Sequence, residues 1–126
     1  MLARWGFRFN HTAINTADER VKILFEGAPD DIGRRCPRLV PSHDRENWSE
    51  MSCVDLWIEY RADDGSLDVR LDGWTMEQLA EMAADPAIAR AGLEALAGGE
   101  SLESRVGAVG TLLDTAFAAA ARPTTA

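Results

Sequence analysis

The chain of 126 residues has little cysteine, a single lysine and no long apolar run. No segment approaches the ~20 consecutive apolar residues that span a bilayer, which excludes a helical membrane protein. The N-terminus lacks the apolar core of a signal peptide, so we expect a cytoplasmic protein. In that reducing compartment the two cysteines, Cys36 and Cys53, are expected to be free thiols.

The charges are unevenly distributed along the chain, which has a formal net charge of −8. Residues 1–45 hold eight basic and six acidic side chains, a net charge of +2, whereas residues 46–126 hold five and fifteen, a net charge of −10. An acidic domain repels phosphate backbones, so nucleic-acid binding is not expected. The acidic half either serves solubility or presents an acidic face to a basic partner. Twelve of the basic residues are arginines, a bias typical of a GC-rich bacterial or phage genome.

A β-hairpin is predicted for residues 54–72. Apolar and polar residues alternate through 54–61 and again through 66–72, which is the period of strands with one buried face. Asp64-Gly65 suits the two central positions of a type I′ turn, because both need a positive φ.

This turn sets the register of the hairpin. The facing pairs that it predicts are chemically compatible: Tyr60–Val69, Ile58–Leu71, Arg61–Asp68 and Glu59–Arg70. A turn at Asp63-Asp64 would instead set Glu59 against Asp68. Opposite charges across a strand pair contribute roughly 0.2–1 kcal/mol, whereas like charges destabilise it. Both turn chemistry and charge therefore favour the first register.

Three helices follow the hairpin, at 76–84, 86–97 and 102–122. Thr75 and Gln78 form a capping box before the first, and Asp85 caps the second. Two further strands are predicted at 3–9 and 21–26. We therefore expect an α+β fold, a mostly antiparallel four-stranded sheet with the three helices packed on one face. Residues 1–122 would form a single domain, and 123–126 a disordered tail.

The last helix carries an apolar stripe along its length, formed by Leu102, Val106, Val109, Leu113, Ala116 and Ala120. This stripe either packs on the sheet or pairs with its copy in a homodimer through 102–122. Gly107 and Gly110 weaken the helix by roughly 1 kcal/mol each relative to alanine. They are interpreted as points where a neighbouring backbone approaches closely.

The connection 27–53 shows little periodicity, and long connections of this kind are usually functional or mobile. A short helix at 44–51 would shorten it. Four arginines crowd beside His43 in this segment: Arg34, Arg35, Arg38 and Arg45. Guanidinium groups on one loop can bind a carboxylate or phosphate, or they can pair with neighbouring acidic residues.

No catalytic, metal or cofactor site is predicted. Zinc ligands normally come as pairs two to five residues apart, whereas Cys36, His43 and Cys53 are separated by seven and ten residues. Ser42-His43-Asp44 resembles a catalytic triad in its residue types, but consecutive residues seldom face one another as a triad requires. A nucleophilic Cys36 paired with His43 lacks an orienting third group.

Trp57 lies on the polar face of the predicted hairpin, diagonal to Arg70. It is either covered by the 27–53 segment or exposed as an anchor for a partner, because tryptophan and arginine lead among interface hot spots. The other three tryptophans, Trp5, Trp48 and Trp74, are interpreted as structural.

Our hypothesis is a non-enzymatic interaction protein that binds a macromolecular partner, expected to be a protein. An immunity or antitoxin-like inhibitor, a phage accessory protein and a regulator all fit this class. The expected binding residues are Trp57 and Arg70 on the hairpin, together with Arg34, Arg35, Arg38, His43 and Arg45. The alternative is a small anion-binding or enzymatic domain that uses the Arg34–Arg45 loop and His43.

Overall fold

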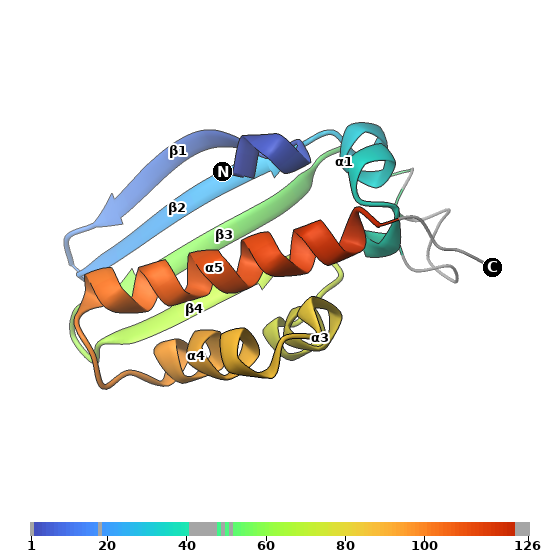
Figure 1. The fold of residues 1–126 in the computed structure, drawn as a ribbon. Coiled ribbons are helices and arrows are strands. Elements are labelled where there is room, and N and C mark those ends of the chain that lie inside the picture. Colours follow the sequence, from blue (N-terminus) through green and yellow to red (C-terminus); the bar gives the residue numbers. More distant parts are fainter. Residues whose placement is uncertain (1, 18, 41–47, 49, 51, 123–126) are drawn as a thin grey trace.

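The computed structural model describes residues 2–17, 19–40, 48, 50 and 52–122. The fold is α+β, as predicted: an antiparallel sheet in the order β1-β2-β3-β4 with helices over one face (Figure 1). Its strands are β1 (Arg8–Asn15), β2 (Arg20–Gly27), β3 (Val54–Arg61) and β4 (Ser66–Leu71). Its α-helices are α1 (Pro29–Arg35), α3 (Met76–Ala83), α4 (Pro86–Ala97) and α5 (Leu102–Ala120). Two 3-10 helices, η1 (Leu2–Trp5) and η2 (Pro37–Leu39), complete the described elements.

The three predicted helices after the hairpin are confirmed, together with their caps. Thr75 and Gln78 form the reciprocal capping box of α3, with hydrogen bonds of 3.1 and 2.9 Å. The Asp85 side chain accepts from the backbone at the start of α4, and Ser101 caps α5. None of the helices among the described residues is both long and apolar enough to cross a membrane. Most of the helix predicted at 44–51 lies outside the described residues. The whole of the tail predicted at 123–126 also lies outside them.

The first strand was predicted too early in the chain. Residues Leu2–Trp5 form η1 instead, and Gly6, with φ of +98°, turns the chain before β1 begins at Arg8. The side chains of Trp5 and Phe7 are both buried, and their spacing resembled strand alternation. Residues 10–15, which lie between the two predicted strands 3–9 and 21–26, form most of β1, because backbone pairing with β2 does not require an apolar face.

The hairpin register was predicted incorrectly. In the structure Ile58 faces Val69 and Tyr60 faces Leu67, so each residue of β3 pairs two positions earlier in β4. The turn occupies 62–65, where Gly65 alone takes a positive φ, of 73°, and its N–H donates to the carbonyl of Arg61 at 2.8 Å. A shift by two residues keeps every side chain on its own face, so the apolar face is unchanged.

The charge argument failed because it considered only two strands. Glu59 does face Asp68, the pair that was rejected. On its other side Glu59 faces Lys22 of β2, and its carboxylate lies 3.8 Å from the guanidinium of Arg20. Asp68 pairs with Arg70 of its own strand at 3.0 Å. Cations from β2 and β4 therefore compensate the like charges that an isolated hairpin would leave opposed.

The core lies between the sheet and α5, whose side chains at Leu112, Leu113 and Phe117 are fully buried. The rings of Phe7 and Phe117 stack with centroids 5.3 Å apart. The apolar stripe of α5 mostly faces this core, since Val109 and Leu113 are buried while Leu102 and Val106 stay exposed. The homodimer through 102–122 remains a prediction, because the structure holds one copy of the chain.

The close approach predicted at Gly107 and Gly110 is found elsewhere. A Cβ at either position would meet nothing within 4 Å. A Cβ at Gly92 of α4 would lie 2.5 Å from Cδ2 of Leu112 in α5. Gly92 is therefore the residue that lets α4 and α5 pack closely together.

Candidate functional site

An apolar groove lies between the β1–β2 end of the sheet and α5. Its volume is about 520 Å³. Phe7, Val109 and Leu113 line its buried part, and Phe9 and Val106 line its open part. Among the described residues of its lining, Arg8 alone is charged. A concave surface of this size and apolar character is typical of a binding site.

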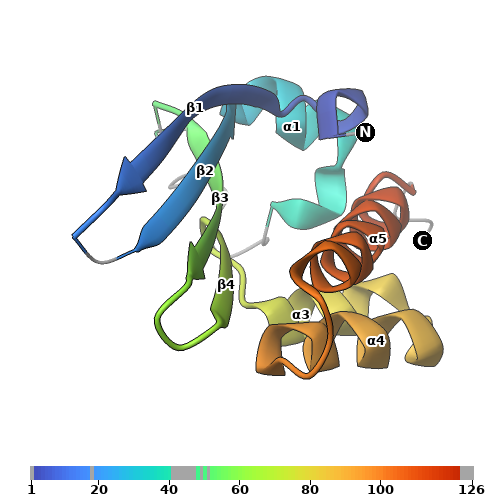
Figure 2. The ribbon, with the colours of Figure 1, turned by 90° about the vertical axis from the view of Figure 1, so that its left-hand side faces the viewer.

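The groove is open because the helices cover only part of the sheet. Figures 1 and 2 show α3 and α4 gathered on the β4 side, far from β1. Every residue of β1 is exposed, including Phe9 at 59% and Ile14 at 68%. The ring of Phe9 packs edge-on against Phe25 of β2, with centroids 6.0 Å apart. Large apolar side chains that remain this exposed beside a groove indicate an interaction surface.

Sequence reasoning missed the groove. Phe7 and Phe9 lie in the segment 3–9, which was predicted as a strand of a sheet with three helices packed on one face. Only the number and placement of the helices determines how much of the sheet they cover. The single available signal was Ile14, an apolar residue within a polar segment.

Trp57 lies on the opposite, outer face of the sheet and is half-buried. The ammonium group of Lys22 lies 3.5 Å from the centre of its ring, a cation–π contact. Arg70 faces Trp57 directly rather than diagonally. Trp57 and Arg70 line a hollow of about 230 Å³ together with four charged residues, Arg20, Lys22, Glu59 and Asp68. Trp57 and Arg70 are thus brought together as predicted, in a setting rich in charge.

The other three tryptophans differ from Trp57 in their hydrogen bonds. The indole N–H of Trp5 donates to Asp114 at 2.9 Å, that of Trp48 to the carbonyl of Pro29 at 2.9 Å, and that of Trp74 to the carbonyl of Leu39 at 2.7 Å. Each bond joins segments far apart in the sequence, which supports a structural role for all three. The indole of Trp57 makes no such bond to a described residue.

The described arginines of the Arg34–Arg45 loop do not converge. Arg34 and Arg35 of α1 both bind the carboxylate of Asp31, and the hydrogen bond from Arg35 lowers the pKa of that carboxyl. Arg38 donates at 3.4 Å to the carbonyl of Ala119, near the end of α5. His43 and Arg45 lie outside the described residues. Pairing of Arg34 and Arg35 with Asp31, and of Arg38 with α5, accounts for the three arginines that the structure describes without a shared anion site.

Cys36 is fully buried, and its thiol lies 3.6 Å from the carbonyl oxygen of Phe117. Burial raises the pKa of this thiol to about 11. It is therefore a neutral thiol near pH 7, unlike the thiolate that a nucleophile requires.

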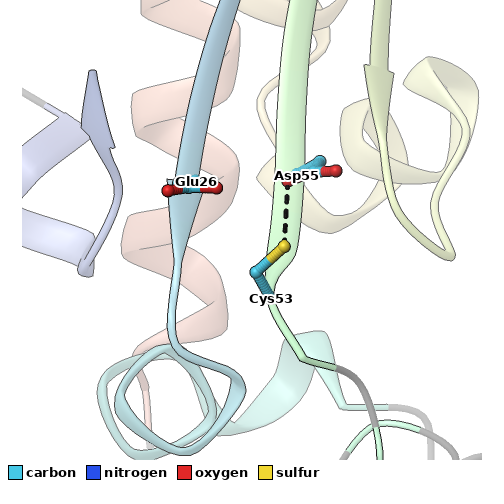
Figure 3. A group of neighbouring side chains, drawn as sticks. All are labelled: Glu26, Cys53 and Asp55. Carbon is cyan, nitrogen blue, oxygen red and sulfur yellow. Dashed lines mark hydrogen bonds between the residues drawn. The ribbon is translucent and has the colours of Figure 1, made fainter. Parts of the chain in front are cut away.

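Glu26, Cys53 and Asp55 form a compact group on the outer face, with one potential ligand atom from each within 4.8 Å of the others (Figure 3). The Cys53 thiol donates to Asp55 at 3.4 Å, and this hydrogen bond raises the pKa of the thiol. Sulfur and carboxylate ligands can bind zinc, but only with the thiol deprotonated. The hydrogen bond to Asp55 favours the protonated thiol of Cys53, and we assign no metal to the group. Cys36 is not part of this group.

No protein-family model, curated protein or solved structure matches this chain.

Proposed function

We propose that this chain is a non-enzymatic interaction protein that binds a protein partner in the groove between β1–β2 and α5. The apolar groove of about 520 Å³ is the observation that carries the proposal. An apolar partner segment would bury Phe9 and Val106, which are 59% and 42% exposed in the isolated chain. Burial of such surface is the main driving force of protein association.

The chemistry of the groove favours a macromolecular segment over a polar metabolite. Nearly all of its described lining is apolar, and Arg8 is the one residue within that part able to form an ion pair. A small polar ligand needs several convergent hydrogen-bonding groups to fix its orientation. An apolar side chain or helix face needs only shape and area.

Within this class, an immunity or antitoxin-like inhibitor, a phage accessory protein and a regulator all fit equally well. The outer face around Trp57 and Arg70 is a second surface that such a protein could use. The anion-binding alternative remains a prediction that depends on His43 and Arg45. The pairing of Arg34 and Arg35 with Asp31 does not favour it.

Gly110 offers a direct test of the groove. This helical residue lines the groove, and a Cβ there would meet nothing within 4 Å. Gly110→Leu therefore adds a side chain at a groove-lining position where its Cβ meets no neighbour. Gly107→Leu is the matched control, because Gly107 lies on the same helix, is exposed, and does not line the groove.

Affinity capture from cells of the source organism would use the wild type, both glycine variants and Trp57→Ala, with captured proteins quantified by mass spectrometry. We expect a partner whose recovery falls at least about tenfold with Gly110→Leu, equivalent to about 1.4 kcal/mol, and is unchanged with Gly107→Leu. Equal recovery with both glycine variants would reject the groove. Loss with Trp57→Ala alone would move the binding site to the outer face.

A further inference from the structure

The two edges of the sheet differ in how they are protected. Natural proteins guard exposed edge strands with charged residues, proline, bulges or short length, because an open edge can pair with another chain. The β4 edge is six residues long, carries Asp68 and Arg70, and is followed by a bridge between Leu71 and Trp74 that turns the chain back. The β1 edge has eight residues, and every one of them is exposed.

The regular part of β1 is short, but it carries no charged residue, proline or bulge. The register with β2 shifts between Phe9 and His11, so Asn10 marks a bulge that interrupts the first third of the strand. Beyond it, residues 11–15 pair continuously with β2. Their sequence, HTAIN, contains no Lys, Arg, Asp, Glu, Pro or Gly. At Thr12, Ala13 and Ile14 the edge of β1 is therefore exposed and unguarded, and it could pair with another strand.

We propose that two copies of the chain pair through this segment, antiparallel across a two-fold axis at Ala13, to form one eight-stranded sheet. Centring the axis on Ala13 sets Thr12 opposite Ile14 of the second copy. Both residues lie on the groove face, because they face Ile23 and Val21 of β2. Ala13 then meets its own copy on the outer face, where its small side chain permits the approach. The inference concerns the edge of β1, and does not depend on what the groove binds.

Charge favours a second copy as the occupant. An antiparallel pair centred on Ala13 brings Arg8 of one copy level with the turn before β2 of the other, which holds Glu19. The Arg8 side chain is 80% exposed, and its guanidinium lies 3.7 Å from the carboxylate of Glu26. Two chains of net charge −8 repel each other, but residues 8–27 hold three basic and three acidic side chains and are neutral. The copies therefore meet where their repulsion is smallest.

Pairing of this kind would form a closed dimer. An isologous interface across a two-fold axis uses the same surface on both copies, so no free copy of that surface remains to recruit further chains. The outer edges of the eight-stranded sheet would be the two guarded β4 strands. Ile14, which is 68% exposed in the single chain, would gain a neighbour on its open side.

Sedimentation equilibrium tests the inference with Ala13→Lys. A lysine at the axis would face its own copy, so it opposes self-pairing more strongly than any single charge elsewhere on the strand. Ala91→Lys is the matched control, an identical change at an exposed alanine of α4. Circular dichroism would verify that both variants fold.

Over protein concentrations from about 1 μM to about 1 mM, the range in which small interfaces associate, the wild-type mass is expected to rise from 13.8 kDa towards twice that value. Ala91→Lys should behave in the same way, and Ala13→Lys should remain a monomer. A wild type that stays monomeric throughout, or an Ala13→Lys variant that dimerises like the wild type, would overturn the inference.

Gly110→Leu separates this inference from the proposed function. The substitution narrows the groove and does not alter the residues of the β1 edge, so the dimer should persist while partner recovery falls. If Gly110→Leu abolishes the dimer and Ala13→Lys does not, the copies meet in the groove, and the edge pairing is rejected. Loss of partner recovery with an unchanged dimer would support both partner binding in the groove and dimer formation through the β1 edge.

Discussion

The guanidinium of Arg105 in α5 donates a hydrogen bond of 2.8 Å to the carbonyl oxygen of Gly65, in the turn between β3 and β4. The same side chain donates to the carbonyls of Ala95 and Leu96, at 2.6 and 3.3 Å, in the last turn of α4. Carbonyls at the end of a helix have no partner within it and carry partial negative charge. Arg105, which is 5% exposed, thereby joins α5, the end of α4 and the hairpin turn.

Arg105→Met should lower the free energy of unfolding by about 2–4 kcal/mol, because three buried or partly buried carbonyls would lose a charged donor. Arg90→Met, at an exposed position of α4, should change it by less than about 0.5 kcal/mol. Urea unfolding followed by circular dichroism measures both. Equal losses in the two variants would show that the Arg105 bonds contribute little.

Gly92→Ala should destabilise the protein by about 1–3 kcal/mol, because the added Cβ would lie 2.5 Å from Leu112 and force α4 and α5 apart. Gly107→Ala should stabilise it by about 1 kcal/mol, since alanine favours a helix and meets no neighbour there. The two variants carry the same chemical change, so opposite signs in urea unfolding would isolate helix packing. Similar increases in the free energy of unfolding for both variants would mean that α4 and α5 accommodate the added Cβ at Gly92 with little cost.

Gly110→Leu should reduce binding of the apolar dye anilinonaphthalene sulfonate, because it occupies the groove that the dye would enter. Gly107→Leu should bind the dye like the wild type. Both variants should gain about 1 kcal/mol in stability from helix propensity. Dye fluorescence titrations and thermal unfolding provide the two measurements. An unchanged titration for Gly110→Leu would place the dye on another surface.

Cys36 should resist alkylation in the folded protein, because its thiol is buried and its pKa is raised to about 11. Iodoacetamide at pH 8, followed by peptide mass spectrometry, should modify Cys36 only after denaturation. Rapid modification of the native protein would show that the core at Cys36 opens readily.

The same raised pKa makes stability depend on alkaline pH. The folded thiol keeps its proton up to about pH 11, whereas the unfolded thiol loses it near pH 9, so the folded state binds more protons between these values. The contribution of Cys36 is complete below about pH 9 and is lost as the pH rises towards about 11. The free energy of unfolding, measured across this pH range, should fall less steeply with rising pH for Cys36→Val than for the wild type.

The elements that could be predicted from sequence are those with local causes. Thr75, Asp85 and Ser101 begin their helices through hydrogen bonds within three residues. The apolar face of the hairpin was predicted correctly because alternation is a property of each strand. Its register was not, because Glu59 is compensated by Lys22 and Arg20 of a strand more than thirty residues away.

The candidate site was less accessible to such reasoning. Trp57 and Arg70 do lie together, as the hairpin predicted, and Trp5, Trp48 and Trp74 make the internal bonds expected of structural residues. The groove could not be predicted, because it is a place that helices leave uncovered. No local pattern records how far α3, α4 and α5 extend across the sheet.

The amino-acid sequence alone determined the fold class, the first residues of α3, α4 and α5, and the face on which each hairpin residue lies, since these depend on periodicity and on contacts between near neighbours. The tertiary structure decided the hairpin register, the close packing at Gly92, the neutrality of Cys36 and the openness of the groove beside Phe9. Each of these depends on which distant segments lie together. That arrangement follows from the packing of the whole chain, and no single segment encodes it.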